Sequence, residues 1–170
     1  TRMKNLKTLL LIAVFTLGLG GVANAQKVGH IDFEKLVAEM PQTKALKLDM
    51  EKLGKTYQDE ITGTEKKLEA TRQKYVAESK TQTKATNDKR AQELQGEAAK
   101  LEQARRYAYQ DMQKRQNEGL KPIIEKAQKA IEDVAAAKGI NYVFDASIGK
   151  GLLVKKGEDL FNAVKAKLGF

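Results

Sequence analysis

The sequence predicts a mainly α protein with a small β body, in which a long antiparallel helical hairpin, a coiled-coil-like arm, projects from a small β-rich base. Two prolines in 170 residues and 31% charged residues favour long solvated helices. Strand-like apolar segments lie near both ends of the chain, about a hundred helical residues apart. A single helix of that length would reach ~150 Å, whereas a hairpin brings the end segments together so that they share one sheet.

Residues 1–25 read as a signal peptide. A basic start at Met3–Lys7 is followed by the uncharged apolar run Thr8–Gly21 and by Ala23-Asn24-Ala25, a motif that predicts cleavage after Ala25. The apolar run is too short to span the ~30 Å core of a bilayer as a helix. An uncleaved membrane anchor is the alternative, and in either case the sequence predicts export.

The base is predicted from residues 26–41 and 138–170. Residues 26–33 have the pattern of a short strand, and about two helical turns follow before Pro41. Near the other end, residues 140–145 and 151–155 read as two strands, and residues 160–168 read as a short helix with one apolar face. These elements supply few large apolar side chains, so we expect the base to associate with other copies.

Residues 42–137 are predicted to form the arm. Leu46, Tyr57 and Leu68 are equally spaced, in the hendecad pattern that is typical of a nearly straight helix. A heptad pattern runs through the second half, and the turn is expected within residues 79–88. Small and polar seam residues, four glycines within the helices and a kink at Pro122 predict a thinly packed, pliable arm. The alternative is an ordinary helical hairpin with some poorly packed positions.

Positive charge concentrates in the outer half of the arm. The net charge of +9 falls to +6 when residues 1–25 are left out, and residues 71–116 alone hold eleven basic and six acidic side chains. We expect these basic side chains to contact a client or a lipid surface, since such a field attracts anionic partners. They are Arg72, Lys74, Lys80, Lys84, Lys89, Arg90, Arg105, Arg106, Lys114 and Arg115. The alternative is a solvated helical face.

Anionic lipid headgroups and acidic polypeptides fit an exported protein better than nucleic acid does. No aromatic residues for base stacking are interleaved with the basic residues. We therefore expect no nucleic-acid partner, because the positive net charge is the one feature in favour of such a partner.

The sequence offers no sign of catalysis. Cysteine is absent and His30 is the single histidine, so neither a thiolate site nor a histidine-based triad or metal site can be built. The carboxylates are spread along helices without a paired set in an apolar pocket. We expect a protein that is not an enzyme and needs no cofactor or metal.

The order of parts resembles the Skp (OmpH) family of periplasmic chaperones. The resemblance covers the whole chain after the signal peptide. Its most specific pieces are Val28-Gly29-His30-Ile31-Asp32 followed by Pro41-Gln42-Thr43-Lys44-Ala45, and Lys138-Gly139-Ile140-Asn141-Tyr142-Val143-Phe144-Asp145. The arm matches in length and composition alone.

The resemblance implies a homotrimer with a trimerising β-rich base, whose arms enclose a cavity. It further implies an ATP-independent periplasmic holdase for unfolded outer-membrane β-barrel proteins. Carried onto this sequence, the oligomerisation base uses Val28, Ile31, Phe33, Val143, Phe144, Leu152 and Val154. The alternative is a structural coiled-coil envelope protein that contacts membrane surfaces through its basic arm tips.

Overall fold

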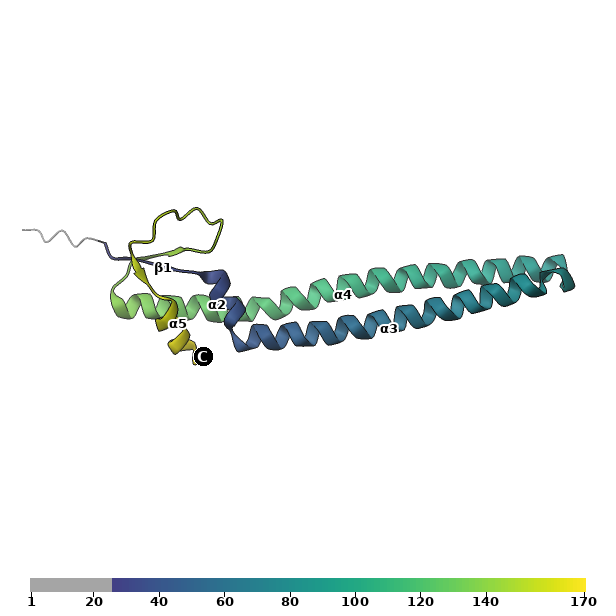
Figure 1. The fold of residues 1–170 in the computed structure, drawn as a ribbon, viewed down its shortest axis with the longest axis horizontal. Coiled ribbons are helices and arrows are strands. Elements are labelled where there is room, and N and C mark those ends of the chain that lie inside the picture. The colour runs from purple at the N-terminus through teal and green to yellow at the C-terminus, as the bar shows by residue number, and fades with distance from the viewer. Residues whose placement is uncertain (1–25) are drawn as a thin grey trace, which may run out of the picture.

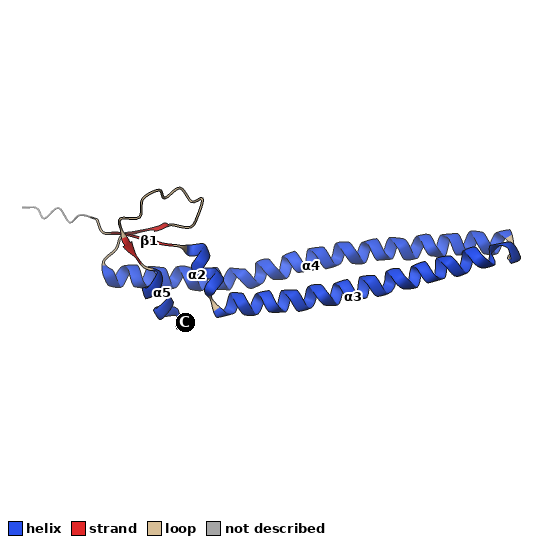
Figure 2. Ribbon diagram, viewed as in Figure 1, coloured by secondary structure: helices blue, strands red, loops and turns tan. Residues whose placement is uncertain are grey.

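The computed structural model describes residues 26–170, so the predicted signal peptide and its cleavage site at Ala25 lie outside the described residues. A small base carries a long two-helix hairpin, as Figure 1 shows. The predicted fold class is therefore confirmed. Most of the described chain is helical, and the strands are confined to the base (Figure 2).

Three short parallel strands form the sheet of the base. The strands β1 (Val28–Ile31), β2 (Tyr142–Asp145) and β3 (Glu158–Asp159) lie in the order β2-β1-β3. Val28 pairs with Tyr142 and Ile31 with Asp145, so segments more than a hundred residues apart become neighbours. The expectation that the hairpin unites the two ends in one sheet is correct.

Two strand predictions were wrong in detail. Phe33 does not extend β1, because Asp32 caps a helix there and Phe33 is the first residue of α2 (Phe33–Glu39). Residues 151–155 form no strand within the protomer. They belong to a loop in which Gly149 and Gly151 have φ angles of 84° and 85°, a conformation that interrupts an extended run. The pairing partner of β1 is instead the acidic pair of β3, whose composition gives no strand signal.

The arm consists of α3 (Pro41–Glu78) and α4 (Lys84–Lys138), joined through the short 3-10 helix η1 (Ser79–Thr81). Pro41 opens α3 at its first position, where its missing N–H costs nothing. The turn is shorter than predicted, since α4 already begins at Lys84. Pro122 lies inside α4 and does not break it, and the helix continues into the base until Gly139 caps it.

The hydrophobic core sits in the base. Its fully buried large side chains are Leu36 and Met40 from the start of the chain, and Leu160 and Val164 from the segment that ends in α5 (Phe161–Leu168). Small and branched residues of α4 complete this cluster. By contrast α3 has no buried residue, so the arm contributes little to the core.

Candidate functional site

One face of the sheet presents apolar side chains to solvent. Because residues alternate along a strand, Tyr142 and Phe144 of β2 share a face with Val28 of β1. Their exposed fractions are 54%, 49% and 41%. The opposite face, with Ile31, packs on the core. The exposed aromatic pair makes this face of the sheet a candidate contact surface.

The seven residues predicted for the oligomerisation base differ in how far they are exposed. Val28, Phe144 and Val154 are exposed, whereas Ile31 is buried in the protomer's own core. The three others, Phe33, Val143 and Leu152, are half-buried. Tyr142 was missed, although the alternation along residues 140–145 was the signal that could have placed it beside Phe144.

A groove of about 700 Å³ runs between the sheet and the part of α4 that lies in the base. Its apolar lining includes Ile31, Phe33, Ile131 and Val143. Since β2 is an edge strand, its free backbone groups border this groove. The base therefore offers a second surface on which another chain could pack.

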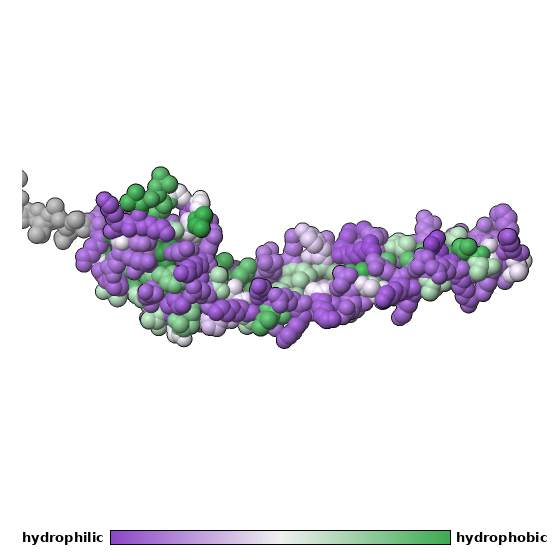
Figure 3. All heavy atoms as spheres, viewed as in Figure 1, coloured by the Kyte–Doolittle hydropathy of each residue, from purple (hydrophilic) through white to green (hydrophobic). Residues whose placement is uncertain are grey.

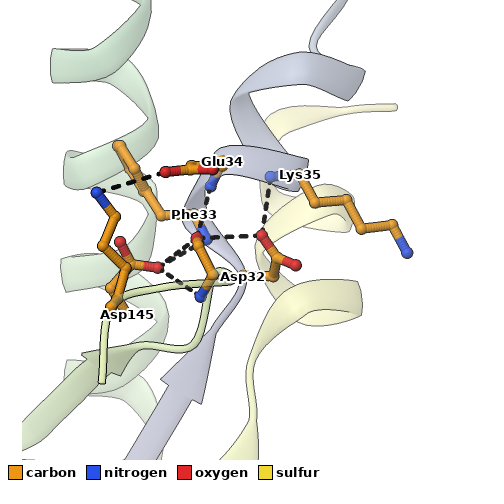
Figure 4. A network of polar contacts seen from close by, with 7 residues as sticks. Asp32, Phe33, Glu34, Lys35 and Asp145 are labelled. Carbon is orange, nitrogen blue, oxygen red and sulfur yellow. Dashed lines mark hydrogen bonds and ion pairs between the residues drawn. The ribbon is translucent and has the colours of Figure 1, made fainter. Parts of the chain in front are cut away.

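Polar contacts fix the junction between the sheet and α2 (Figure 4). The Asp32 carboxylate accepts from the Lys35 N–H at 2.9 Å, and the Asp145 carboxylate accepts from the Ser147 N–H at 2.9 Å and the Phe33 N–H at 3.4 Å. The Ser147 hydroxyl lies 2.5 Å from the Asp145 carboxylate. Burial raises the pKa of Asp145, but the hydrogen bonds from Ser147 and Phe33 outweigh it and hold that pKa below its ordinary value.

Few side chains are buried in the seam of the arm, the line of contact between α3 and α4. In the part of α4 that faces α3 along the outer arm, Leu101 and Ala108 are the buried residues. Polar contacts supplement the packing, as the Tyr57 hydroxyl donates to Asp111 at 2.8 Å and its ring meets that of Tyr107 edge-on. The arm is thus held by scattered contacts, and the prediction of thin packing is confirmed.

An open groove interrupts the seam near the root of the arm. The volume of this groove is about 430 Å³. Leu46, Met50, Met112 and Leu120 are the apolar side chains of its lining, and Gly54 adds no side chain to fill it. Methionine adapts its shape to what it contacts. The side chains around this groove are therefore loosely packed, and its two methionines can adapt their shape to a bound chain.

Nine of the ten predicted basic residues are exposed along the outer arm. Five of the nine form ion pairs with carboxylates of the arm, for example Arg115 with Asp111 at 2.6 Å. Within residues 26–170 the remaining four form no ion pair: Lys74, Lys80, Lys89 and Arg106. The charges of these four side chains are therefore the most available to a partner.

Arg90, the tenth, has a different environment. Its guanidinium lies 4.4 Å from the centre of the Tyr75 ring and 2.6 Å from the Glu78 carboxylate. Its side chain is 19% exposed. These contacts join α3 to α4 next to the turn, so Arg90 fastens the tip of the hairpin.

Comparison with known proteins identifies the family. The sequence model described as "Outer membrane protein (OmpH-like)" matches residues 27–168, nearly all of the described chain. The chain belongs to this OmpH-like family. No match was found among curated proteins.

A solved structure shares the OmpH-like fold. A protein from Caulobacter crescentus CB15, assigned as an OmpH-like outer membrane chaperone, superposes with a TM-score of 0.75 at 17% sequence identity. The match covers 84% of this chain and 83% of that one. At this identity the likeness shows the shared fold of base and arm.

Between residues 26 and 170 no three His, Asp or Glu side chains gather in a way that could hold a metal ion. No helix in that range carries an apolar stretch long enough to cross a bilayer. His30 lies buried in the central strand of the sheet. The exposed sheet face and the basic arm are candidate binding surfaces.

Proposed function

We propose that this OmpH-like protein is an ATP-independent periplasmic holdase chaperone, a homotrimer that keeps unfolded outer-membrane β-barrel proteins soluble in a cavity between its arms. The observation that carries the proposal is the difference between the base and the arm. A base with an exposed apolar face is joined to a long arm that has little core of its own.

The base supplies the surface for assembly. Val28, Tyr142 and Phe144 expose apolar area that a second copy would cover, and the groove beside β2 lies next to them. Leu152 and Val154 lie in the segment between β2 and β3, which belongs to the base. Cyclic association through this end leaves all arms projecting from a common base.

The arms supply the surface for clients. A seam with two buried residues along its outer part can change shape at low cost. Exposed lysine and arginine side chains raise the encounter rate with acidic unfolded chains. The signal-peptide pattern of residues 1–25 indicates export. Membership of the OmpH-like family also supports the periplasm as the compartment.

The competing function is a structural coiled-coil protein of the envelope that touches membranes through its basic tips. The four unpaired basic side chains of the outer arm are the observation in its favour. A structural coiled coil requires rigid arms and a fixed partner, whereas few side chains are buried between α3 and α4 of this arm.

Sedimentation distinguishes the two functions. The chain from Gln26 to Phe170 is measured alone and after dilution of a urea-unfolded outer-membrane barrel into the same buffer. A holdase gives one soluble species that contains the assembly and the barrel protein. An assembly that leaves the barrel protein to aggregate would favour the structural coiled coil, and a monomer would contradict the shared base.

A further inference from the structure

Two of the three methionines in residues 26–170 line one groove. The sequence contains neither cysteine nor tryptophan, so the thioether sulfur of methionine is the softest nucleophile of the chain. The three methionines are Met40, Met50 and Met112. Met50 and Met112 both line the open groove near the root of the arm, which we call the root groove.

The three methionines differ in their access to solvent. Met50 and Met112 are half-buried and border a groove of about 430 Å³. Met40 is 0% exposed and belongs to the core of the base. Figure 3 shows hydrophobic atoms among hydrophilic ones where the arm leaves the base. Because oxidation of methionine follows exposure, a dissolved oxidant reaches the pair in the root groove before it reaches Met40.

The methionines of the root groove take part in the contact between the two arm helices. Leu46, Met50 and Gly54 follow at intervals of four on α3, and Met112 and Leu120 lie two such intervals apart on α4. Residues with this spacing share one face of a helix. A Cβ at Gly54 would lie 3.5 Å from the methyl carbon of Met112. Since α3 has no fully buried residue, these side chains are a large part of what joins the helices at the root.

The root groove lies apart from the surface that we propose for assembly. Its lining comes from residues 43–54 of α3 and 112–120 of α4, and it shares no residue with the groove beside β2. A hydroperoxide such as hydrogen peroxide is close to water in size. It can therefore enter the space between the arms of an assembly.

We propose that Met50 and Met112 are a redox modification site of the arm, at which a hydroperoxide converts both side chains to methionine sulfoxide. The sulfur attacks the hydroxyl oxygen of the peroxide, and the S–O bond forms as the O–O bond breaks. The proton of that hydroxyl goes to the other peroxide oxygen, which leaves as water or an alcohol. The sulfur loses two electrons and the peroxide gains them.

Oxidation weakens the contact between α3 and α4 at the root. A sulfoxide is polar and has a strong hydrogen-bond acceptor, so it is poorly accommodated between apolar side chains. The Thr43 hydroxyl in the lining already donates to the Val37 carbonyl. The other donors of the lining are the exposed side chains of Lys47 and Gln116. Each sulfoxide therefore turns toward these groups and toward water, and leaves the leucines of the groove.

Peptide mapping by mass spectrometry tests the selectivity of the site. The chain from Gln26 to Phe170 is treated with hydrogen peroxide, and peptides are weighed over time. We expect Met50 and Met112 to gain one oxygen atom each at least about tenfold faster than Met40. Oxidation of Met40 at the same rate as the pair, or a pair that reacts only after unfolding, would overturn the proposal.

Hydrogen exchange tests the effect on the arm. We expect peroxide to speed the exchange of backbone amides in residues 46–54 and 112–120 severalfold, and to leave the tip, residues 75–93, unchanged. Met50→Leu/Met112→Leu keeps the volume of the side chains and removes both sulfurs, so its exchange should not respond to peroxide. Met40→Leu is the matched control and should keep the full response. A response in the double variant equal to that of the wild type would show that the site is wrong.

Reduction distinguishes a reversible modification from damage. Two methionine sulfoxide reductases, one for each epimer of the sulfoxide, restore the thioether. After treatment with both enzymes, exchange at the root should return to the rate of the untreated protein. Exchange that stays fast although the added oxygen has been removed would contradict a reversible site.

This proposal does not depend on the proposed function, because none of its measurements requires a client. Failure of the untreated protein to hold an unfolded barrel protein in solution would contradict the chaperone and leave the redox site standing. A root groove that does not respond to peroxide would overturn the redox site and leave the chaperone function standing.

Discussion

Gly119 shows how one residue decides the contact between the two arm helices. A Cβ at Gly119 would lie 2.5 Å and 2.9 Å from the two methyl carbons of Leu46, whereas one at Gly96 would meet nothing within 4 Å. The first glycine permits a close approach of α3 and α4, and the second has no such role. Composition could not tell these two positions apart.

Substitution by alanine should therefore have opposite effects at the two glycines. Gly96→Ala should raise the free energy of unfolding by about 0.5–1 kcal/mol, because alanine favours the helix. Gly119→Ala should lower it by about 1 kcal/mol, because overpacking against Leu46 outweighs the same gain. Urea denaturation measures both, and equal stabilisation by the two variants would show that the helices do not approach closely at Leu46.

Asp111 connects the seam of the arm to pH. Hydrogen bonds from Tyr57 and from Arg115 hold the pKa of Asp111 below its ordinary value. A carboxyl whose pKa is lowered by folding stabilises the protein above the pKa of the unfolded chain, near 3.9 for aspartate. That stabilisation is lost as the pH falls through the folded pKa.

Asp111→Asn should consequently lower the unfolding temperature at pH 6, and the difference from the wild type should shrink as the pH falls below about 4. Thermal unfolding followed by circular dichroism measures the difference. Asp88→Asn is the control, since Asp88 pairs with Lys84 on the same helix and does not join the two helices. An undiminished difference at the lowest pH would contradict the role of the Asp111 carboxylate.

At the scale of elements, the junction of β2, α2 and the loop that follows β2, residues 146–157, depends on Asp145. Its carboxylate accepts hydrogen bonds from the first residue of α2 and from Ser147 at the start of the loop. These contacts join segments 112 residues apart in the chain. They explain how a sheet of short strands keeps its register.

Asp145→Ala should lower the free energy of unfolding by about 1–3 kcal/mol, because it leaves part-buried N–H groups without an acceptor. Hydrogen exchange should show faster exchange at Phe33 and Ser147 than in the wild type. Glu158→Ala is a suitable control, as Glu158 forms an exposed ion pair with Lys138 and such pairs contribute little. Unchanged exchange at Ser147 would contradict the junction.

At the scale of the whole molecule, the exposure of Phe144 separates assembly from folding. Phe144 is 49% exposed and Ile31 is 2% exposed in the protomer. Phe144→Asp should lower the sedimentation mass to that of a monomer while circular dichroism stays helical. Ile31→Asp should unfold the base, because it buries a charge without a partner. If Phe144→Asp keeps the mass of the wild type, the interface lies elsewhere.

The charge of the arm should govern the rate of capture. Replacing Lys74, Lys80, Lys89 and Arg106 by glutamine should slow the association of an acidic unfolded barrel protein severalfold at low salt, and the difference should fade as salt screens the charges. Stopped-flow fluorescence of a labelled client measures the rate. A salt-independent difference would show that these side chains act through packing.

Local propensity and periodicity were enough to predict the plan of this protein. The apolar spacing of Leu46, Tyr57 and Leu68 and the scarcity of proline predicted the arm, and the position of the strand-like segments predicted that both ends meet in one base. These features depend on local propensity and periodicity, which a sequence carries directly. The most specific pieces of the family resemblance lay in the segments at the two ends of the described chain, residues 28–45 and 138–145.

Contacts between distant segments determine which residues are exposed and therefore available to a partner. Ile31 and Phe144 look alike as apolar strand residues, yet register and alternation bury the first and expose the second. The acidic strand β3 exists because β1 offers it a partner, and residues 151–155, with a better strand pattern, remain a loop. Arg90 fastens the tip because Tyr75 and Glu78 lie across the turn from it. Each outcome depends on contacts between distant segments, so physical reasoning from one sequence could not fix it.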